Sequence, residues 1–449
     1  MTGRPGATRA TRPTRTTRPT RTTRLTWAVS VAVILAVAVS ACGGQTPTSA
    51  TKSTDRLEVV SWWTSGSEAA ALGTLFTAFG QADPNVVPIN GAVAGGAGSK
   101  AIVALAKRLQ KGDPPDVWQT FAGKSVQGYA ERGSIRDLTS VFTAGELRTT
   151  MQPTILRSLL RDGKPYGVPT GAHRSNVLWF NRDVLRKAGV TPPSGNYSLT
   201  AFLDDLKKVK AAGAVPLCLG GADPFTTVEL FENTLLSTIG IDGWQAMADD
   251  KLDWRGRRIT TALTRFGDLL SYTDPGAHAL TWDQATKKLA TGGCAFESMN
   301  DSAYGELLAA GAREGAAFGA TAFPGTESSF LAVVDVFVAA TAAQNAKNAL
   351  AFLGGINQPA TQLAFSRAKG SVPVVRNVNV SALPTYQRDS SKSLWTLPVL
   401  LSVAHGEAMS PRFQEGFYNA VATYIRTRNP DAFVDDLENA VSKDKIPPR

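Results

Sequence analysis

The chain is poor in the residues that most often hold metals or perform catalysis. It has three histidines and three cysteines among 449 residues. It contains no H-E-x-x-H pair, no cysteine pair at metal-ligand spacing and no aspartate-rich loop, which argues against a metal site. The G-x-S-x-G turn of serine hydrolases is also absent. We therefore expect no metal, no cofactor and no catalytic residue.

Two other types of functional site, a phosphate-binding loop and the carboxylate pair of a glycoside hydrolase, are incomplete in the sequence. The stretch FAGKS at 121–125 resembles the end of a phosphate-binding loop, but Trp118 stands where the first glycine of that loop belongs. Gly123 and Ser125 therefore indicate the start of a helix.

A glycoside hydrolase would need two facing carboxylates. Glu68, Asp301 and Asp335 are available, yet their spacing selects no pair. We expect a protein that is not an enzyme, and a secreted glycoside hydrolase is the alternative.

Acidic residues are missing from the start of the chain. Seven arginines and no aspartate or glutamate precede Trp27. Subtracting these seven charges from the net charge of +10 leaves a nearly neutral body of +3. Because the basic charge belongs to the leader and not to a folded surface, we expect no nucleic-acid partner.

The leader has the three parts of a secretory signal peptide over residues 1–41. Its apolar run from Trp27 to Ala41 has about 15 residues, short of the roughly 20 that span a bilayer. Small residues then precede Cys42. This pattern is similar to the bacterial lipoprotein signal, in which Cys42 becomes the lipid anchor, and an ordinary cleaved signal is the alternative. The polar residues 42–55 fit a flexible tether. We expect a lipid-anchored protein on the extracellular face of the bacterial cytoplasmic membrane.

The other two cysteines, Cys218 and Cys294, lie in apolar, strand-like runs. An oxidising exterior would permit a disulfide between them. Two buried free thiols are equally consistent with the sequence.

The body of the chain predicts an α/β fold. Its length exceeds that at which a single hydrophobic core stops growing, so two domains are expected. Strand-like and helix-like segments alternate throughout. A helix is predicted after residues 57–63, because Leu72, Leu75 and Phe79 share one helical face and Pro84 ends the pattern. Residues 331–340 predict a strand buried on both faces.

Polar and aromatic residues follow several predicted strands. Trp62 and Trp63 come directly after the first strand, and Gln119, Asp301 and Asp335 lie at or beside other strand ends. In parallel α/β sheets, ligands bind outside the carboxyl ends of the strands. Successive strand side chains point to opposite faces, so only one of the two tryptophans can point into the core. The sequence thus leaves two interpretations of the pair, as plain core or as part of a ligand site.

From Leu57 to about Asn429 the chain resembles the extracellular sugar-binding lipoproteins of ABC importers, and most of all the glucose/mannose-binding type. GDPPDVWQ is shared widely among solute-binding proteins, whereas AHRSNVLW together with AHGEA is more specific to the glucose/mannose branch. The other matching stretches are SWWTSGSE, GGAGSKA, YGVPTGAHRSNVLWFN, AFESMND and KGSVP.

The resemblance implies a two-lobed, periplasmic-binding-protein-like α/β fold of type II, with several hinge crossings. The crossings are expected near residues 170–173, 333–337 and 370–373. Residues 56–171 plus 334–372 would form the N-terminal lobe, and 172–333 plus 373–449 the C-terminal lobe.

The resemblance also implies the residues that contact the ligand. The implied substrate-binding set is Trp62, Trp63, Glu68, Gln119, His173, Phe225, Asp301, Lys369 and His405. Two departures from the family stand out: Ser302 follows Asp301 where relatives carry an aromatic, and GADPFTT replaces a loop that bears a stacking tryptophan. Phe225 is the expected substitute, and Trp244 a second candidate.

The implied function is capture of a glucose- or mannose-like monosaccharide by lobe closure and delivery to a membrane permease, with the protein acting as a monomer. Alternatives are an oligosaccharide, an aminosugar or a glycerol phosphate as ligand, or a sensory role in place of transport.

Overall fold

The computed structural model describes residues 56–444. The predicted signal peptide, the anchor Cys42 and the tether lie outside the described residues. Among the residues that are described, none of the helices combines the length and apolarity that a membrane crossing requires.

The first sheet has five strands and contains β1, the first strand of the described chain. β1 pairs in parallel with β2 and β3, while β13 and β6 complete the sheet in antiparallel pairings. Its strands in spatial order are β2 (Val87–Asn90), β1 (Arg56–Val60), β3 (Val117–Phe121), β13 (Asp335–Ala339) and β6 (Val168–Pro169).

The second sheet has four strands in the order β11, β8, β10 and β9. A smaller sheet has three strands in the order β14, β12 and β7. Its strands β7 and β12 lie where the chain passes from one large sheet to the other. The remaining strands are β4 (Leu160–Arg161), β5 (Lys164–Pro165), β7 (His173–Arg174), β8 (Val177–Asn181), β9 (Leu217–Cys218), β10 (Phe296–Ser298), β11 (Phe318–Ala322), β12 (Phe330–Val333) and β14 (Val399–Leu401).

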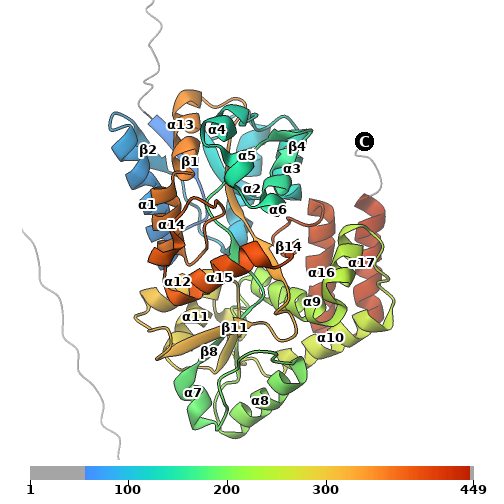
Figure 1. Cartoon of the computed structure of the whole chain (residues 1–449). Helices are drawn as coiled ribbons and strands as arrows, with labels where there is room; N and C mark the ends of the chain where they lie inside the picture. Colours follow the sequence, from blue (N-terminus) through green and yellow to red (C-terminus); the bar gives the residue numbers. More distant parts are fainter. Residues whose placement is uncertain (1–55, 445–449) are drawn as a thin grey trace, which may run out of the picture. The chain divides into compact units, whose positions relative to one another are not determined.

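Along the chain, the strands of the first sheet are connected through helices α1 to α6, and helices α13 and α14 follow its strand β13. They are α1 (Gly66–Ala82), α2 (Ser99–Gln110), α3 (Lys124–Glu131), α4 (Thr139–Ala144), α5 (Leu147–Thr150), α6 (Pro153–Ser158), α13 (Ala346–Ile356) and α14 (Pro359–Lys369). The others are α7 (Arg182–Lys187), α8 (Leu199–Ala211), α9 (Pro224–Ala248), α10 (Arg257–Leu270), α11 (Trp282–Ala290), α12 (Ser302–Ala309), α15 (Thr385–Thr396), α16 (Pro411–Thr427) and α17 (Pro430–Asp444). Three short 3-10 turns, η1 (Gly96–Gly98), η2 (Ala277–Ala279) and η3 (Val380–Ala382), complete the elements. Figure 1 shows α16 and α17 packed side by side.

Each large sheet has hydrophobic packing of its own. Leu57, Val59 and Trp118 belong to one core with α1, α13 and α14. The second sheet is buried in two other clusters, one on each of its faces, because alternate strand residues such as Trp179 and Phe180 enter different clusters. The predicted α/β class is confirmed by this arrangement.

The chain passes between the sheets at segments expected to be hinges. β6 belongs to the first sheet and β7 to the small sheet, while β12 leads directly into β13 of the first sheet. Ala172 also forms a bridge to Val372, and its N–H donates to the Val372 carbonyl at 2.9 Å.

Cys218 and Cys294 form a disulfide, the outcome that the sequence left open. Cys218 lies on β9, and Cys294 comes just before β10, its parallel neighbour in the sheet. Both cysteines are buried. The bond therefore joins β9 to the residues that lead into β10, and the exits of both strands continue toward the cavity described next.

Candidate functional site

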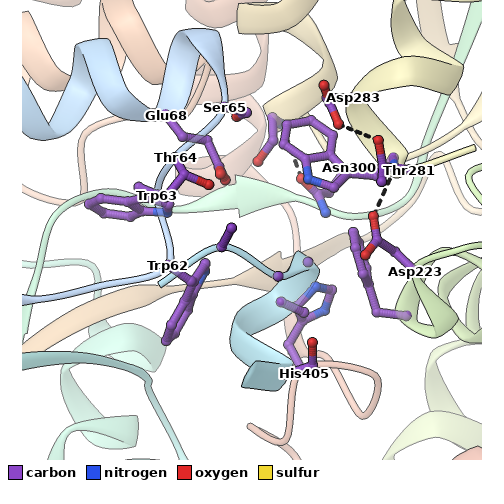
Figure 2. Close-up of a pocket in the computed structure, with 18 of the residues that line it drawn as sticks. Trp62, Trp63, Thr64, Ser65, Glu68, Asp223, Thr281, Asp283, Asn300 and His405 are labelled. Atoms are coloured by element: carbon purple, nitrogen blue, oxygen red, sulfur yellow. Dashed lines mark hydrogen bonds between the residues drawn. The ribbon is translucent and has the colours of Figure 1, made fainter. Parts of the chain in front are cut away.

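A cavity of about 560 Å³ lies where exits from both large sheets meet. Figure 2 shows side chains that converge on it from separate elements. Its wall comes from parts of segments 62–68, 94–100, 222–225, 281–283 and 299–302, and from Phe121, His173, Val333, Asp335, Lys369 and His405.

Trp62 lines the cavity at the exit of β1. Its ring lies 5.0 Å from that of Phe121 by centroids and covers Gly98, where a Cβ would come within 2.6 Å of the indole. The backbone N–H of Trp62 donates to Gln119 Oε1 at 3.3 Å. Gln119 Nε2 in turn donates to Asp335 Oδ1 at 2.7 Å, so one amide positions both residues.

Trp63 occupies a different environment, although it also touches the cavity. Its ring packs 5.6 Å from Phe337 and 5.2 Å from Phe365 and is almost completely buried. Figure 2 shows the two indoles pointing in different directions from the backbone. The Nε1 of Trp63 is buried and has no hydrogen-bond partner among the described residues.

A buried ion pair connects α1 with the end of α14. Lys369 Nζ lies 3.2 Å from Glu68 Oε1 and donates to Ser302 Oγ at 2.7 Å. Burial raises the pKa of Glu68, with Lys369 opposing it. The cavity wall therefore presents a cation and a carboxyl group next to each other.

His173 lies between two carboxylates. Its Nδ1 is 2.5 Å from Asp301 Oδ1, and its Nε2 is 3.5 Å from Asp335 Oδ2. Burial and Lys369 act against protonation of His173, but the two carboxylates outweigh them and raise its pKa. Burial alone would raise the pKa of Asp335, yet His173, Lys369 and Gln119 together lower it. The imidazole of β7 is thus held in place by charge from both sides.

His405 is an uncharged aromatic group in the cavity wall. Burial lowers its pKa to about 3. Its ring meets Phe121 at 5.2 Å and Phe225 at 5.7 Å, both edge to face. Its Nδ1 lies 3.1 Å from Ser402 Oγ, and Glu232 accepts hydrogen bonds from Ser402 and from two following backbone N–H groups. A neutral imidazole can donate to one ligand atom or accept from it without electrostatic cost.

The opposite wall carries a tryptophan that sequence reasoning missed. Trp282, the first residue of α11, lines the cavity, and its backbone N–H donates to Asp223 Oδ2 at 2.9 Å. The cap pattern T-W-D-Q places this residue at the start of a helix, but no local pattern shows which cavity the side chain faces. By contrast, Trp244 lies in the core of the second sheet, where its Nε1 donates to the Leu401 carbonyl. Trp244 is therefore wrong as a stacking candidate.

Most of the predicted ligand-contact residues come together around this cavity. Those that line it are Trp62, Trp63, Glu68, His173, Phe225, Lys369 and His405. Gln119 and Asp301 do not line it and lie behind Asp335 and His173. The sequence neighbours of Asp301, Asn300 and Ser302, line the cavity instead, because the Asp301 carboxylate turns to the Arg174 N–H and to His173.

The cavity can bind a small molecule that has apolar faces and a polar rim. Indole and phenyl rings offer apolar surfaces, and carboxylates, the Asn300 amide and two lysines offer polar partners. In the described part of the chain, no group of three or more histidine, cysteine or acidic side chains is arranged to hold a metal ion. Fold and site together define a two-lobed protein that binds a small solute.

Comparisons with known proteins agree with this class. A sequence model of the bacterial extracellular solute-binding proteins matches residues 74–391, and the chain belongs to this family. Its members bind solutes and are not enzymes, which confirms the expectation that this protein is not an enzyme. The two-lobed fold is confirmed by solved structures.

Three proteins are similar to this chain in sequence or in structure. The chain is 27% identical to an uncharacterized ABC transporter extracellular-binding protein of Pyrococcus horikoshii, over 93% of this chain and 95% of that one. It is 30% identical to a probable sugar-binding periplasmic protein of Rhizobium meliloti, over 88% of this chain and 96% of that one. The structure of the bacterial solute receptor AcbH, described with an exclusive preference for β-D-galactopyranose, matches with a TM-score of 0.76 at 18% identity, covering 87% of this chain and 98% of that chain.

Proposed function

We propose that the protein captures a glucose- or mannose-like monosaccharide between its lobes and delivers it to the permease of an ABC importer. The observation that carries this proposal is that aromatic residues from both sheets line the cavity: Trp62 belongs to the core of the first sheet, and Phe225 and Trp282 belong to a cluster of the second. A pyranose has apolar C–H faces that aromatic rings cover. The relatives named as sugar-binding proteins support the same ligand class.

The polar residues suit the rim of such a ring. Sugar hydroxyls both donate and accept, so they can pair with Glu68 and Asp335 as acceptors and with Lys369 as donor. Buried hydrogen bonds to charged groups contribute roughly 1.5–3 kcal/mol each. A few of them, after ordering costs, give the roughly 8 kcal/mol of micromolar binding.

The proposal includes the lobe boundaries predicted from the sequence, with closure about the segments at 170–173, 333–337 and 370–373. It also includes anchoring through a lipid on Cys42 at the extracellular face of the cytoplasmic membrane, and a monomer that meets the permease. The leader supports the lipid anchor, and family membership supports a permease as the partner.

A second candidate ligand is a larger sugar. The cavity of about 560 Å³ lies well inside the range of about 300–1,000 Å³ typical of pockets for drug-sized ligands. Among solved structures of the same fold is a chitin oligosaccharide binding protein, with a TM-score of 0.75. A glycerol phosphate is less well supported, because the described cavity wall contains two lysines and no arginine.

A thermal-shift panel tests the proposal and separates these ligands. A sugar that binds only the folded protein raises the melting temperature as its concentration passes the Kd. We expect D-glucose or D-mannose to raise it, and D-glucosamine, maltose, chitobiose and glycerol 3-phosphate to have smaller effects. A shift with maltose or chitobiose alone would replace the monosaccharide with an oligosaccharide.

A further inference from the structure

The first helix of the described chain lacks a cap of its own. The N-cap residue of α1, Ser65, makes no side-chain capping hydrogen bond. The first N–H groups of a helix have no partner within it and need an acceptor. That acceptor is Glu306, whose Oε1 receives the Ser67 N–H at 2.8 Å and the Ser67 hydroxyl at 2.7 Å. The cap of α1 therefore comes from a residue 239 positions away.

Glu306 and the helix that it caps belong to different cores. α1 buries Leu72 and Phe79 with the first sheet, whereas α12 buries Tyr304 and Leu307 with the second. The hydrogen bonds between Ser67 and Glu306 thus cross from one lobe to the other. Figure 1 shows α12 next to α1 and α14.

The Glu306 carboxylate depends on this contact. It is fully buried, and its Oε2 has no hydrogen-bond partner among the described residues. The closest cation recorded for it is Lys287 Nζ at 3.8 Å. A buried carboxylate is costly unless it is paired, and the N-terminus of a helix provides N–H donors and a partial positive charge. The Glu306 carboxylate receives these N–H donors and this partial positive charge only while α1 and α12 are in contact.

The face of α12 is shaped for close approach. A Cβ on Gly305 would come within 2.8 Å of both the Lys369 carbonyl and the Ser67 Cβ, so a side chain there would separate the helices. Ser302 lies one helical turn before Glu306 on the same face and accepts from Lys369 Nζ. This face of α12 therefore holds both α1 and the end of α14.

We propose that Glu306 is a positioning residue that caps α1 from the opposite lobe and so stabilises the closed form around the ligand. The proposal rests on the proposed function, because it presupposes closure over a solute. Glu306 does not line the cavity, but the N-cap residue Ser65 and Glu68 in the first turn of α1 do. Capping by Glu306 thus fixes the position of two cavity residues relative to the second lobe.

The test compares Glu306→Gln with the wild-type protein and with Glu297→Gln. Glu297 is a matched control, because it is also a buried glutamate of the second lobe but pairs with Thr286 inside that lobe. Replacing charge-assisted hydrogen bonds with neutral ones should weaken D-glucose binding about tenfold in Glu306→Gln. Glu297→Gln should bind as the wild type does. Gly305→Ala should also weaken binding, because its methyl group keeps α12 away from α1.

Amide hydrogen exchange provides a readout specific to the cap. We expect the Ser67 amide to exchange faster in Glu306→Gln than in the wild type when sugar is bound, because the cap forms in the closed state, while amides of the second sheet stay unchanged. Wild-type affinity together with wild-type exchange at Ser67 would overturn the proposal. So would an equal fall in melting temperature with and without sugar at unchanged affinity, because that result describes ordinary stabilisation. If the wild type binds neither D-glucose nor D-mannose, the monosaccharide assignment fails, and the exchange at Ser67, measured with a sugar of the panel that does bind, still decides whether Glu306 caps α1.

Discussion

At the scale of single residues, Trp62 and Trp63 are neighbours in sequence with different surroundings. Trp62 faces the cavity beside Phe121, while Trp63 packs between Phe337 and Phe365. Both are nearly buried, so burial does not distinguish them. The contacts of each ring do distinguish them, and they suggest separate roles.

Substitution should separate these roles. Trp62→Ala should lower sugar affinity at least about tenfold, because a stacked aromatic face is lost. Trp63→Ala should mainly lower the free energy of unfolding, by about 3–5 kcal/mol, through a core cavity. Calorimetric titration and urea denaturation of both variants measure the two effects. Loss of stability alone in both variants would mean that the pair is plain core.

Buried glutamates of the second lobe predict how stability depends on pH. Burial raises the pKa of Glu232 to about 7 and that of Glu297 to about 8. The folded protein therefore keeps protons that the unfolded chain releases above its ordinary glutamate pKa near 4.5. Stability is then fully present below about pH 4.5 and falls as the pH rises through these raised values, with a slope of at most roughly 1.4 kcal/mol per pH unit for each group.

Glu297→Gln tests this relation directly. Glutamine resembles the protonated acid and can still accept from Thr286 Oγ1. We expect the melting temperature of the wild type to fall between pH 5 and pH 8. The melting temperature of the variant should fall less, so that the variant is the more stable at pH 8. Equal pH dependence in the two proteins would show that Glu297 does not retain its proton in the folded state.

At the scale of elements, the disulfide fixes two strands that lead into the site. β9 continues into the segment that bears Asp223 and Phe225, and β10 continues into Met299 and Asn300. The cysteines are 76 positions apart. Closing a loop of that length restricts the unfolded chain and should stabilise the fold by about 4.5 kcal/mol in the chain-entropy model.

The double variant Cys218→Ser with Cys294→Ser should therefore unfold at lower urea concentration than the oxidised wild type. Reductant should shift the wild type toward the variant and leave the variant unchanged. Identical midpoints for oxidised wild type and variant would contradict a stabilising role for this bond.

Elements with local signals were predictable from the sequence. The apolar spacing of Leu72, Leu75 and Phe79 correctly indicated α1. Ser198 caps α8 by accepting from the Ala201 N–H, a serine position that is itself a local signal. Features that depend on distant segments were not predictable. Neither the cap of α1 by Glu306 nor the antiparallel entry of β13 beside β3 has a local pattern.

At the scale of the whole molecule, strand ends predicted where the site forms but not which atoms face it. Trp62, His173 and His405 reach one cavity from three separate segments. Asp301 was expected beside them, yet its carboxylate turns to His173 and Arg174, a choice that only the packed neighbours determine. Trp282 was missed because a tryptophan at a helix start gives no sign of which cavity it will face.

The central claim is that one monosaccharide binds in the cavity between the lobes. Calorimetric titration of residues 43–449 with D-glucose and D-mannose tests it most directly. We predict saturable binding of one of them, with a stoichiometry of one and a micromolar Kd. Absence of heat and of saturation with both sugars would contradict the claim, and would mean that the changed aromatic residues of the second lobe select a different solute.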